Sequence, residues 1–454
     1  MPERVAILGL ARSGRAAALL ALRSGAAVYA SDAGDTPELR AAAAEIQRAG
    51  GDAEVGGHDV ARLTGSDLVV LSPGIPPTAT VLTDHRVAVV PRISELEFAF
   101  RALRAPVIAI TGTNGKSTTT ALTAHLLASA GYDAPAAGNI GLALSEVALR
   151  EPAPDWVVVE ASSFQLADID RFAPRIGVVT NLSPDHLDRY ASVEAYYADK
   201  ARLFANARAD SIWVLNAEDE AVVALPGEAD GARLVFRVNT QLTAAEEGGC
   251  ITPAGELLVR LHGTETRLLH TSELRLLGRH NQANAVAAAV TALSAGASAA
   301  AVADGLRSFR GLEHRLEYVV TDEDVAWIND SKATNIEAAL VALRSMTRPT
   351  VLLLGGRHKG EAYTRLLPEL RRTVRAVVAF GEAGPQIERE LTRAVPVIAV
   401  RGGFEDVVLR AAELAQPGDA VLLAPACSSF DMFRSYEERG RRFKELARSV
   451  AAHG

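Results

Sequence analysis

The stretch Val107-Ile-Ala-Ile-Thr-Gly-Thr-Asn-Gly-Lys-Ser-Thr-Thr-Thr120 decides how the chain is organised. Its apolar β-forming residues predict a buried strand, its Gly/Asn-rich centre predicts a turn, and residues 121–130 have a helical pattern. A strand, a turn and a helix N-terminus form an anion site, because backbone N–H groups and the positive end of the helix dipole converge there. The stretch therefore predicts a phosphate-binding loop.

Two side chains of this loop suit a nucleotide. Lys116 would contact the β- and γ-phosphates, and the Ser117 hydroxyl would hold Mg²⁺. The first glycine of the standard motif is replaced by Ile110, so the loop is a shortened variant. The alternative is a strand–helix turn that uses glycine for its geometry alone.

Length and composition limit the class of protein. The 454 residues suggest about three domains, and the net charge of −8 argues against a nucleic-acid-binding surface. Two cysteines, Cys250 and Cys427, make no disulfide framework and no zinc pattern. The N-terminus has no signal peptide, and no apolar run reaches the ~18 residues that span a bilayer. We expect a cytoplasmic protein without membrane insertion.

The N-terminal segment has the pattern of a Rossmann-like unit. A strand at Val5–Gly9, a helix at Arg15–Arg23 and a strand at Ala27–Ser31 lead to Asp32. In Gly9-Leu-Ala-Arg-Ser-Gly14, however, Ala11 stands where a dinucleotide's pyrophosphate needs glycine. This weakens a dehydrogenase interpretation but leaves room for a nucleotide diphosphate.

Further strand ends of the first two segments carry polar residues. The Ser72–Pro77 turn either contacts a ligand or only reverses the chain. Asn139 lies in a Gly-flanked loop, and Glu160 ends an apolar strand, a common place for a Mg²⁺ ligand. His186 follows another strand within an Asp/His/Asp cluster, which favours a functional role. Lys200, by composition alone, would be a solvated helix lysine.

Residues 217–277 predict turns and short strands. An alanine-rich helix then runs to about Ser294, with Asn281 and Asn284 on one face. These two amides either cap the helix or read an adenine edge.

The third segment alternates strand and helix from Val325 to a final helix that starts at Asp431. Such alternation predicts a mostly parallel sheet covered on both faces. Three of its strand ends carry Asp330-Ser-Lys-Ala-Thr-Asn335, Gly355-Gly-Arg-His-Lys-Gly360 and Pro425-Ala-Cys-Ser-Ser-Phe430. We expect these ends to form one site for a substrate that bears a carboxylate.

Four motifs together resemble the Mur ligases of peptidoglycan synthesis: Thr111–Thr118, Thr180–Asp188, Leu277–Asn284 and His314-Arg315. The similarity spans essentially the whole chain. Within the family, Asp330–Asn335 and Ala424–Asp431 look like the motifs of the members that add D-glutamate to UDP-N-acetylmuramoyl-L-alanine. The resemblance implies an ATP-dependent amide ligase that acts through an acyl phosphate.

The resemblance also implies three α/β domains: a Rossmann-like UDP-sugar domain (1–94), a P-loop-type ATP domain (95–311) and a Rossmann-like amino-acid domain (312–454). It assigns catalytic roles to Lys116, His186, Lys200 and Lys332. ATP would contact Gly112, Thr113, Asn114, Gly115, Lys116, Ser117, Thr118, Asn281, Asn284, Arg315 and Asp330. The UDP-sugar would contact Ala11, Arg12, Ser72, Gly74 and Asn139, and D-glutamate would contact Thr334, Lys359, Ser429 and Tyr436. Two Mg²⁺ sites would use Ser117, Glu160, His186 and Lys200, the last as a carbamate made from CO₂.

Two positions depart from the family. His358 stands where an acidic residue is common, and Tyr436 where another aromatic residue can stand. As a metal ligand, His186 would be a poor proton acceptor, so the base that frees the amine stays unassigned. We expect a monomer. The rivals are a regulatory ATPase that ligates nothing and, less favoured, a nicotinamide dehydrogenase.

Overall fold

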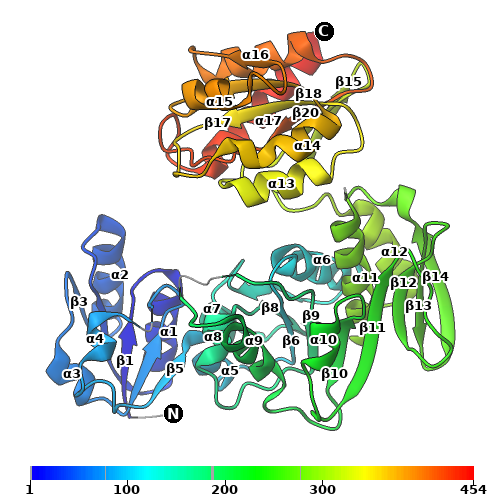
Figure 1. Cartoon of the computed structure of the whole chain (residues 1–454). Helices are drawn as coiled ribbons and strands as arrows, with labels where there is room; N and C mark the ends of the chain where they lie inside the picture. Colours follow the sequence, from blue (N-terminus) through cyan, green and yellow to red (C-terminus); the bar gives the residue numbers. More distant parts are fainter. Residues whose placement is uncertain (1–2, 77, 186–188, 277, 454) are drawn as a thin grey trace. The chain divides into compact units, whose positions relative to one another are not determined.

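The computed structural model describes residues 3–76, 78–185, 189–276 and 278–453, whose strands form three sheets (Figure 1). Helices alternate with mostly parallel strands, so the predicted α/β class is confirmed. Contacts divide the chain into two compact units. The first is Met1–Thr271 with Ala283–Leu306, and the second is Ser272–Gln282 with Arg307–Gly454. The domain boundaries near residues 94 and 311 stay predictions.

The first sheet is Rossmann-like, with parallel strands in the order β3-β2-β1-β4-β5. Alternate residues of β1 face opposite sides: Val5 and Ile7 pack with helices α1 and α2, whereas Ala6 and Leu8 pack with α3 and α4. The elements are β1 (Arg4–Leu8), α1 (Arg12–Arg23), β2 (Ala27–Asp32), α2 (Pro37–Arg48), β3 (Asp52–Val55), α3 (Val60–Thr64), β4 (Leu68–Leu71), α4 (Thr80–Thr83), β5 (Arg92–Ser94) and α5 (Glu95–Phe100).

The second sheet, in the same unit, has the order β14-β13-β12-β11-β10-β9-β6-β8-β7. Strands β6 to β12 are parallel, and β13 and β14 extend the sheet as an antiparallel edge. Its elements are β6 (Val107–Thr111), α6 (Lys116–Ser129), β7 (Ala136–Gly138), α7 (Leu144–Ala148), β8 (Val157–Glu160), α8 (Ser163–Ala167), β9 (Ile176–Val179), α9 (Val193–Ala201), η1 (Arg202–Phe204), β10 (Ile212–Asn216), α10 (Glu220–Ala224), β11 (Ala232–Val238), β12 (Gly248–Ile251), β13 (Glu256–Leu261) and β14 (Thr264–His270). They are followed by η2 (Thr271–Glu273), α11 (Arg279–Ser294) and α12 (Ala299–Ser308).

The third sheet has the order β15-β16-β20-β17-β18-β19 and is parallel except for the β15 edge. In β17, Leu352 and Leu354 pack with α13, α14 and α15, whereas Val351 and Leu353 pack with α16 and α17. The elements are β15 (Glu317–Asp322), β16 (Val325–Asn329), α13 (Ile336–Arg344), β17 (Thr350–Gly355), η3 (Tyr363–Leu366), α14 (Leu367–Thr373), β18 (Val374–Phe380), α15 (Gly384–Leu391), β19 (Val397–Ala399), α16 (Phe404–Leu414), β20 (Ala420–Leu423) and α17 (Tyr436–His453).

The last helix begins at Tyr436, so the prediction of a start at Asp431 was wrong. The Asp431 carboxylate instead accepts a hydrogen bond from the Glu382 N–H at 3.0 Å, and the Met432 N–H donates to the Ser429 carbonyl at 3.1 Å. Because of these hydrogen bonds, residues 429–433 form a turn that precedes the helix. Across the described residues, no helix is both long enough and apolar enough to cross a bilayer.

A buried carboxylate joins the connection between the first two sheets to the loop after α8. Glu97, in α5, is fully buried and accepts backbone hydrogen bonds from Asp170, Arg171 and Phe172, the last at 2.8 Å. It also pairs with Arg101 at 2.7 Å. Three backbone N–H groups and the Arg101 guanidinium therefore stabilise the negative charge of Glu97.

We expect Glu97→Gln to lower the free energy of unfolding by about 3 kcal/mol, because the amide carries less charge and turns an N–H₂ group toward N–H donors. Urea unfolding measures the loss. Glu151→Gln is the matched control: its ion pair with Arg23 is solvent-exposed and contributes about 0–1 kcal/mol. Equal losses in the two variants would contradict this role of Glu97.

Candidate active site

The phosphate-binding loop has the predicted geometry. Strand β6 ends at Thr111 and helix α6 begins at Lys116. Gly112 and Gly115 between them have positive φ angles of 138° and 82°. A Cβ on Gly112 would lie 2.0 Å from the Thr180 hydroxyl, so no larger residue fits there. The turn thus places the N-terminus of a 14-residue helix directly after the loop backbone, as an anion site requires.

The neighbouring strand β9 fixes the position of this loop. The Asn114 N–H donates to the Asn181 side-chain oxygen at 2.9 Å, and the Asn181 amide donates back to the Asn114 carbonyl at 2.9 Å. The Thr180 hydroxyl donates to the same carbonyl at 2.6 Å. Thr180 and Asn181 begin the predicted family motif Thr180–Asp188, but neither was predicted to hold the loop. Their position directly after the strand beside β6 was the available signal.

Lys116 lies folded over the loop. Its ammonium donates to the carbonyls of Gly112 at 3.0 Å and Thr113 at 2.8 Å. In α6, Ser117 and Thr118 occupy the first turn, where a ligand phosphate would meet the helix.

Asn284 lies beside the same loop. The Thr119 hydroxyl donates to its side-chain oxygen at 3.2 Å, and a Cβ on Gly115 would lie 2.4 Å from that oxygen. Asn281 belongs to the second unit. Helix α11 begins at Arg279, so neither asparagine is its N-cap. The capping alternative is therefore excluded.

A buried carboxylate with a spare oxygen lies at the end of β8, next to β6. One oxygen of Glu160 accepts a hydrogen bond from the Asn139 amide at 2.8 Å. The other is buried and has no hydrogen-bond partner among the residues that the structure describes. A buried carboxylate oxygen without a partner is costly, and a bound cation would satisfy it. Glu160 therefore fits a Mg²⁺ site, and Asn139 orients it.

Lys200 is not a solvated helix residue: it is only 1% exposed. Its ammonium donates to the Gly112 carbonyl at 2.8 Å and lies 4.5 Å from the centre of the Tyr196 ring. Burial, and then the Lys116 charge, lowers the pKa of Lys200 to about 7. The i,i+4 spacing of Tyr196 and Lys200 was a signal for this pair. His186 lies outside the described residues.

The N-terminal loop is closely packed. A Cβ on Gly14 would lie 1.6 Å from the Gly9 carbonyl, so α1 can approach the loop only with glycine there. The buried Ser72 hydroxyl donates to that carbonyl at 3.1 Å. Asp32 accepts hydrogen bonds from the N–H groups of Leu10 and Gly34, each at 2.8 Å. Its carboxylate thus orders the loop. The other predicted UDP-sugar residues, all at the surface of this region, are Ala11, Arg12 and Gly74.

In the second unit, three adjacent strands bring the predicted third-segment motifs to one edge. Strand β20 pairs with β16 and β17, and all three are parallel, so their carboxyl ends lie side by side. Lys332 and Thr334 follow β16, Lys359 follows β17, and Ser429 follows β20. The Lys332 ammonium lies 5.5 Å from the centre of the Tyr436 ring, at the start of α17. The predicted convergence within this sheet is therefore present.

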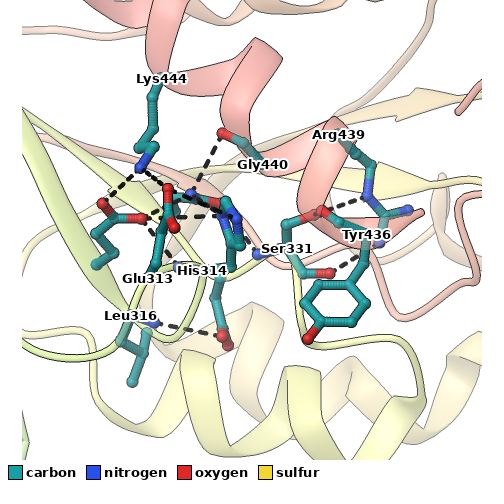
Figure 2. Close-up of polar contacts among 11 residues, drawn as sticks. Glu313, His314, Leu316, Ser331, Tyr436, Arg439, Gly440 and Lys444 are labelled. Carbon is teal, nitrogen blue, oxygen red and sulfur yellow. Dashed lines mark hydrogen bonds and ion pairs between the residues drawn. The ribbon is translucent and has the colours of Figure 1, made fainter. Parts of the chain in front are cut away.

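A buried arginine, not singled out from the sequence, links two of these ends, and Figure 2 shows it beside Ser331. Arg439 of α17 is fully buried and donates to the Ser331 hydroxyl at 3.0 Å and the Ser331 carbonyl at 2.9 Å. It also donates to the Cys427 carbonyl at 3.2 Å. The Ser331 hydroxyl donates to the Tyr436 carbonyl at 2.8 Å. Arg439 thus links the loops after β16 and β20.

Asp330 is a buried acid at the end of β16. One of its oxygens accepts a hydrogen bond from the Leu316 N–H at 3.3 Å (Figure 2). Burial raises the pKa of Asp330 to about 7, although the Leu316 hydrogen bond and the charges of Arg315 and Lys332 act in the opposite direction. A carboxyl group whose pKa is raised to near neutral pH in this way is typical of a functional position.

The raised pKa of Asp330 predicts a pH effect on stability. The folded chain binds this proton more tightly than the unfolded chain, so the free energy of unfolding contributed by Asp330 falls as pH rises from about 4 to about 7. The difference in the free energy of unfolding between Asp330→Asn and the parent protein should therefore shift in favour of the variant as pH rises from about 5 to about 8. Urea unfolding at both pH values measures this. Asp324→Asn, which alters an exposed ion pair with Arg348, should show no such gain. A difference for Asp330→Asn that is independent of pH would contradict the shift.

The first unit thus presents a phosphate loop, a lysine and a buried carboxylate oxygen that has no partner among the described residues. The second presents lysines and hydroxyls along one sheet edge. The groups of the first unit suit a nucleoside triphosphate with a divalent cation, and the groups of the second unit suit an anionic substrate.

Comparison with known proteins gives the family. Residues 110–292 match the Mur ligase middle domain, and residues 314–427 match the Mur ligase glutamate ligase domain. Two curated relatives, from Salinibacter ruber (42% identical; 98% of both chains) and Anaeromyxobacter dehalogenans (44%; 99% of this chain, 98% of the relative), are named UDP-N-acetylmuramoylalanine–D-glutamate ligase.

Solved structures share the fold. A pseudomurein peptide ligase type C from Methanothermus fervidus has a TM-score of 0.59 at 17% identity, covering 99% of this chain and 100% of its own. UDP-N-acetylmuramate-alanine ligase MurC from Thermotoga maritima has a TM-score of 0.58 at 21% identity, covering 98% and 99%. The resemblance found in the sequence is confirmed by the family models and the full-length relatives: the chain belongs to the Mur ligase family.

Proposed function

We propose that this chain is an ATP-dependent ligase that joins D-glutamate to UDP-N-acetylmuramoyl-L-alanine in cytoplasmic peptidoglycan precursor synthesis. The observation that carries the substrate choice is the full-length identity of 42–44% to relatives named for this reaction. The phosphate loop and the third-sheet edge support it, because the reaction needs a triphosphate and two carboxylate substrates.

The proposed reaction has two steps. A carboxylate oxygen of the L-alanyl group attacks the γ-phosphorus of ATP, forming an acyl phosphate while ADP leaves. The neutral amine of D-glutamate then attacks the acyl carbon, the carbon–oxygen bond to phosphate breaks, and inorganic phosphate leaves with the carboxylate oxygen. The nitrogen loses one proton, to water or to the departing phosphate, as the amide forms. Both steps bring anions together, so positive charge that is fixed in place before reaction lowers the barrier.

Residues of the first unit would bind and orient the nucleotide and the acceptor. Lys116 and the α6 N-terminus would hold the phosphates, and Asn284 would lie toward the adenosine. Ser117 would hold one Mg²⁺, whereas Glu160, His186 and Lys200 would hold a second. Bound Mg²⁺ would supply charge neutralisation for the phosphoryl group. Ala11, Arg12, Ser72, Gly74 and Asn139 would contact the UDP-sugar.

Lys200 would act as a carbamate. Its neutral amine attacks CO₂, a nitrogen–carbon bond forms, one proton leaves to solvent, and the product is a carboxylate. The burial that lowers the pKa of Lys200 to about 7 favours the neutral amine that this step needs.

Residues of the second unit would contact the nucleotide and D-glutamate. Asn281, Arg315 and Asp330 would contact the nucleotide, and Lys332 would stabilise the phosphoryl group being transferred. Thr334, Lys359, Ser429 and Tyr436 would hold D-glutamate. We propose that the chain acts as a monomer with three domains at 1–94, 95–311 and 312–454.

Isotope transfer tests the proposed chemistry. With ¹⁸O in the L-alanyl carboxylate, ATP, Mg²⁺ and D-glutamate, the released phosphate should carry one ¹⁸O per amide formed, detected by mass spectrometry. Phosphate that takes its oxygen from water instead would mean ATP hydrolysis without acyl activation and would favour the regulatory ATPase.

A further inference from the structure

Hydrogen bonds join the loops after β17 and β20, in addition to the pairing of the two strands. The Arg357 N–H donates to the Ser428 carbonyl at 2.9 Å, and the Ser428 hydroxyl donates to the Arg357 carbonyl at 3.4 Å. Each loop also carries one residue proposed to hold D-glutamate, Lys359 in the first and Ser429 in the second. The distance between those two residues therefore depends on how the loops are held together.

A chain of three side chains forms a second link between these loops. The Tyr363 hydroxyl lies 3.1 Å from His358 Nδ1 and 3.0 Å from Cys427 Sγ. Tyr363 and Cys427 are buried, at 1% and 0% exposure, while His358 is half-buried. The Tyr363 ring also packs against the His358 ring, with centroids 5.6 Å apart. The hydroxyl is thus the central atom of the link, and its contact with Cys427 is shielded from water.

The tyrosine hydroxyl can be joined to its two partners by either of two proton arrangements, since the histidine nitrogen and the thiol can each donate or accept. Burial raises the pKa of the Tyr363 hydroxyl and raises that of the Cys427 thiol to about 11, so both groups keep their protons. In one arrangement the thiol donates to the Tyr363 oxygen and the hydroxyl donates to His358 Nδ1. In the other, His358 Nδ1–H donates to the Tyr363 oxygen and the hydroxyl donates to Cys427 Sγ. In each arrangement the Tyr363 hydroxyl donates one hydrogen bond and accepts one.

Each end of the link is close in sequence to a proposed substrate contact. His358 precedes Lys359 directly, and Cys427 precedes Ser429 by two residues. The Lys359 charge also lies close enough to the Cys427 thiol to act on its pKa. A shift of the link would therefore move a cation and a hydroxyl relative to each other.

We propose that Tyr363 is a positioning residue for the amino-acid pocket: through His358 and Cys427, it sets the spacing between Lys359 and Ser429. This inference rests on the proposed function, since it assumes that those two residues hold D-glutamate. It also gives a role to His358, which departs from the acidic residue common in the family: its Nδ1 forms a hydrogen bond with the Tyr363 hydroxyl.

The test is steady-state kinetics of Tyr363→Phe with the three substrates varied separately. Removing one neutral hydrogen-bonding group should raise the KM for D-glutamate about fivefold, while kcat and the KM for ATP change by less than about twofold. Tyr318→Phe is the matched control. Tyr318 is 43% exposed in β15, and its hydroxyl contacts only Thr321 among the described residues, so its kinetics should match the parent protein.

Variants of Cys427 separate positioning from simple damage to the fold. Cys427→Ala should also raise the KM for D-glutamate, and Cys427→Ser should restore it, because a serine hydroxyl can donate to the Tyr363 oxygen. The Tyr363→Phe/Cys427→Ala double variant should be less impaired than the product of the two single effects, since both changes break one link. Thermal unfolding of each variant shows whether the fold is kept.

An unchanged KM for D-glutamate in Tyr363→Phe would overturn the inference, as would equal losses for every substrate or no rescue by serine. Failure of the proposed function is distinguishable, because the parent protein itself would then form no amide with D-glutamate.

Discussion

Replacement of Lys200 by alanine is expected to reduce ligase activity by at least about 10²-fold while the protein stays folded. The side chain is buried, and its ammonium contacts the phosphate loop at the Gly112 carbonyl. As a carbamate it would add a carboxylate beside Glu160, whose second oxygen lacks a partner among the described residues. Loss of the side chain removes the proposed metal ligand. It also relieves the burial of a charge, so the melting temperature should change little.

The carbamate makes activity depend on CO₂. We expect the initial rate of the parent protein to fall when bicarbonate is stripped from the buffer and to recover when it is added. Lys200→Ala should not respond. Lys444→Ala is the matched control, because Lys444 pairs with Glu313 and Glu317 in the second unit and should keep the response. Full activity of Lys200→Ala, together with a parent rate that ignores bicarbonate, would contradict the proposed role.

Lys116→Ala is expected to lower kcat/KM for ATP by about 10²- to 10³-fold, the usual effect of removing one preorganised charge from a transition state. In the free protein the ammonium is held by the carbonyls of Gly112 and Thr113. It is therefore fixed at the loop before ATP arrives, and its transfer to the phosphates needs only a small movement.

Steady-state kinetics with varied ATP and calorimetric ATP binding measure this effect. The fold should be kept, since the loop is also held by Asn181 and Thr180, which contact Asn114. Lys444→Ala serves again as the control for loss of a lysine elsewhere. If Lys116→Ala stays within about twofold of the parent protein, the loop does not bind the transferred phosphate as we propose.

The sequence predicted the parts of this protein whose local signals agree with the fold. The 107–120 stretch gave the strand, turn and helix that became β6, Gly112–Gly115 and α6, because its glycines and its apolar residues act locally. The carboxyl-edge convergence in the third sheet was also predictable, since alternating strands and helices leave parallel strand ends together. Asp330 and Lys332 could be placed there on that basis.

Burial by distant segments was not predictable. Lys200 lies in a helix of ordinary polar composition, and only its packing under Gly112 makes it a buried lysine. Nothing in the charged sequence of α17 separates Arg439 from Arg441 or Arg442, because its burial comes from the loops after β16 and β20. The spacing of Asn281 and Asn284 correctly placed both residues in one helix, α11, but it could not show that contacts assign them to different compact units.

The most direct test of the account is the amino-acid dependence of the reaction. The purified protein is given ATP, Mg²⁺ and UDP-N-acetylmuramoyl-L-alanine with one amino acid at a time, and both phosphate and UDP-linked product are measured. We predict phosphate release only with D-glutamate, in equal amounts with a product one glutamyl residue heavier. Release with another amino acid would reassign the third-sheet pocket, and release that ignores the amino acid would contradict the ligase.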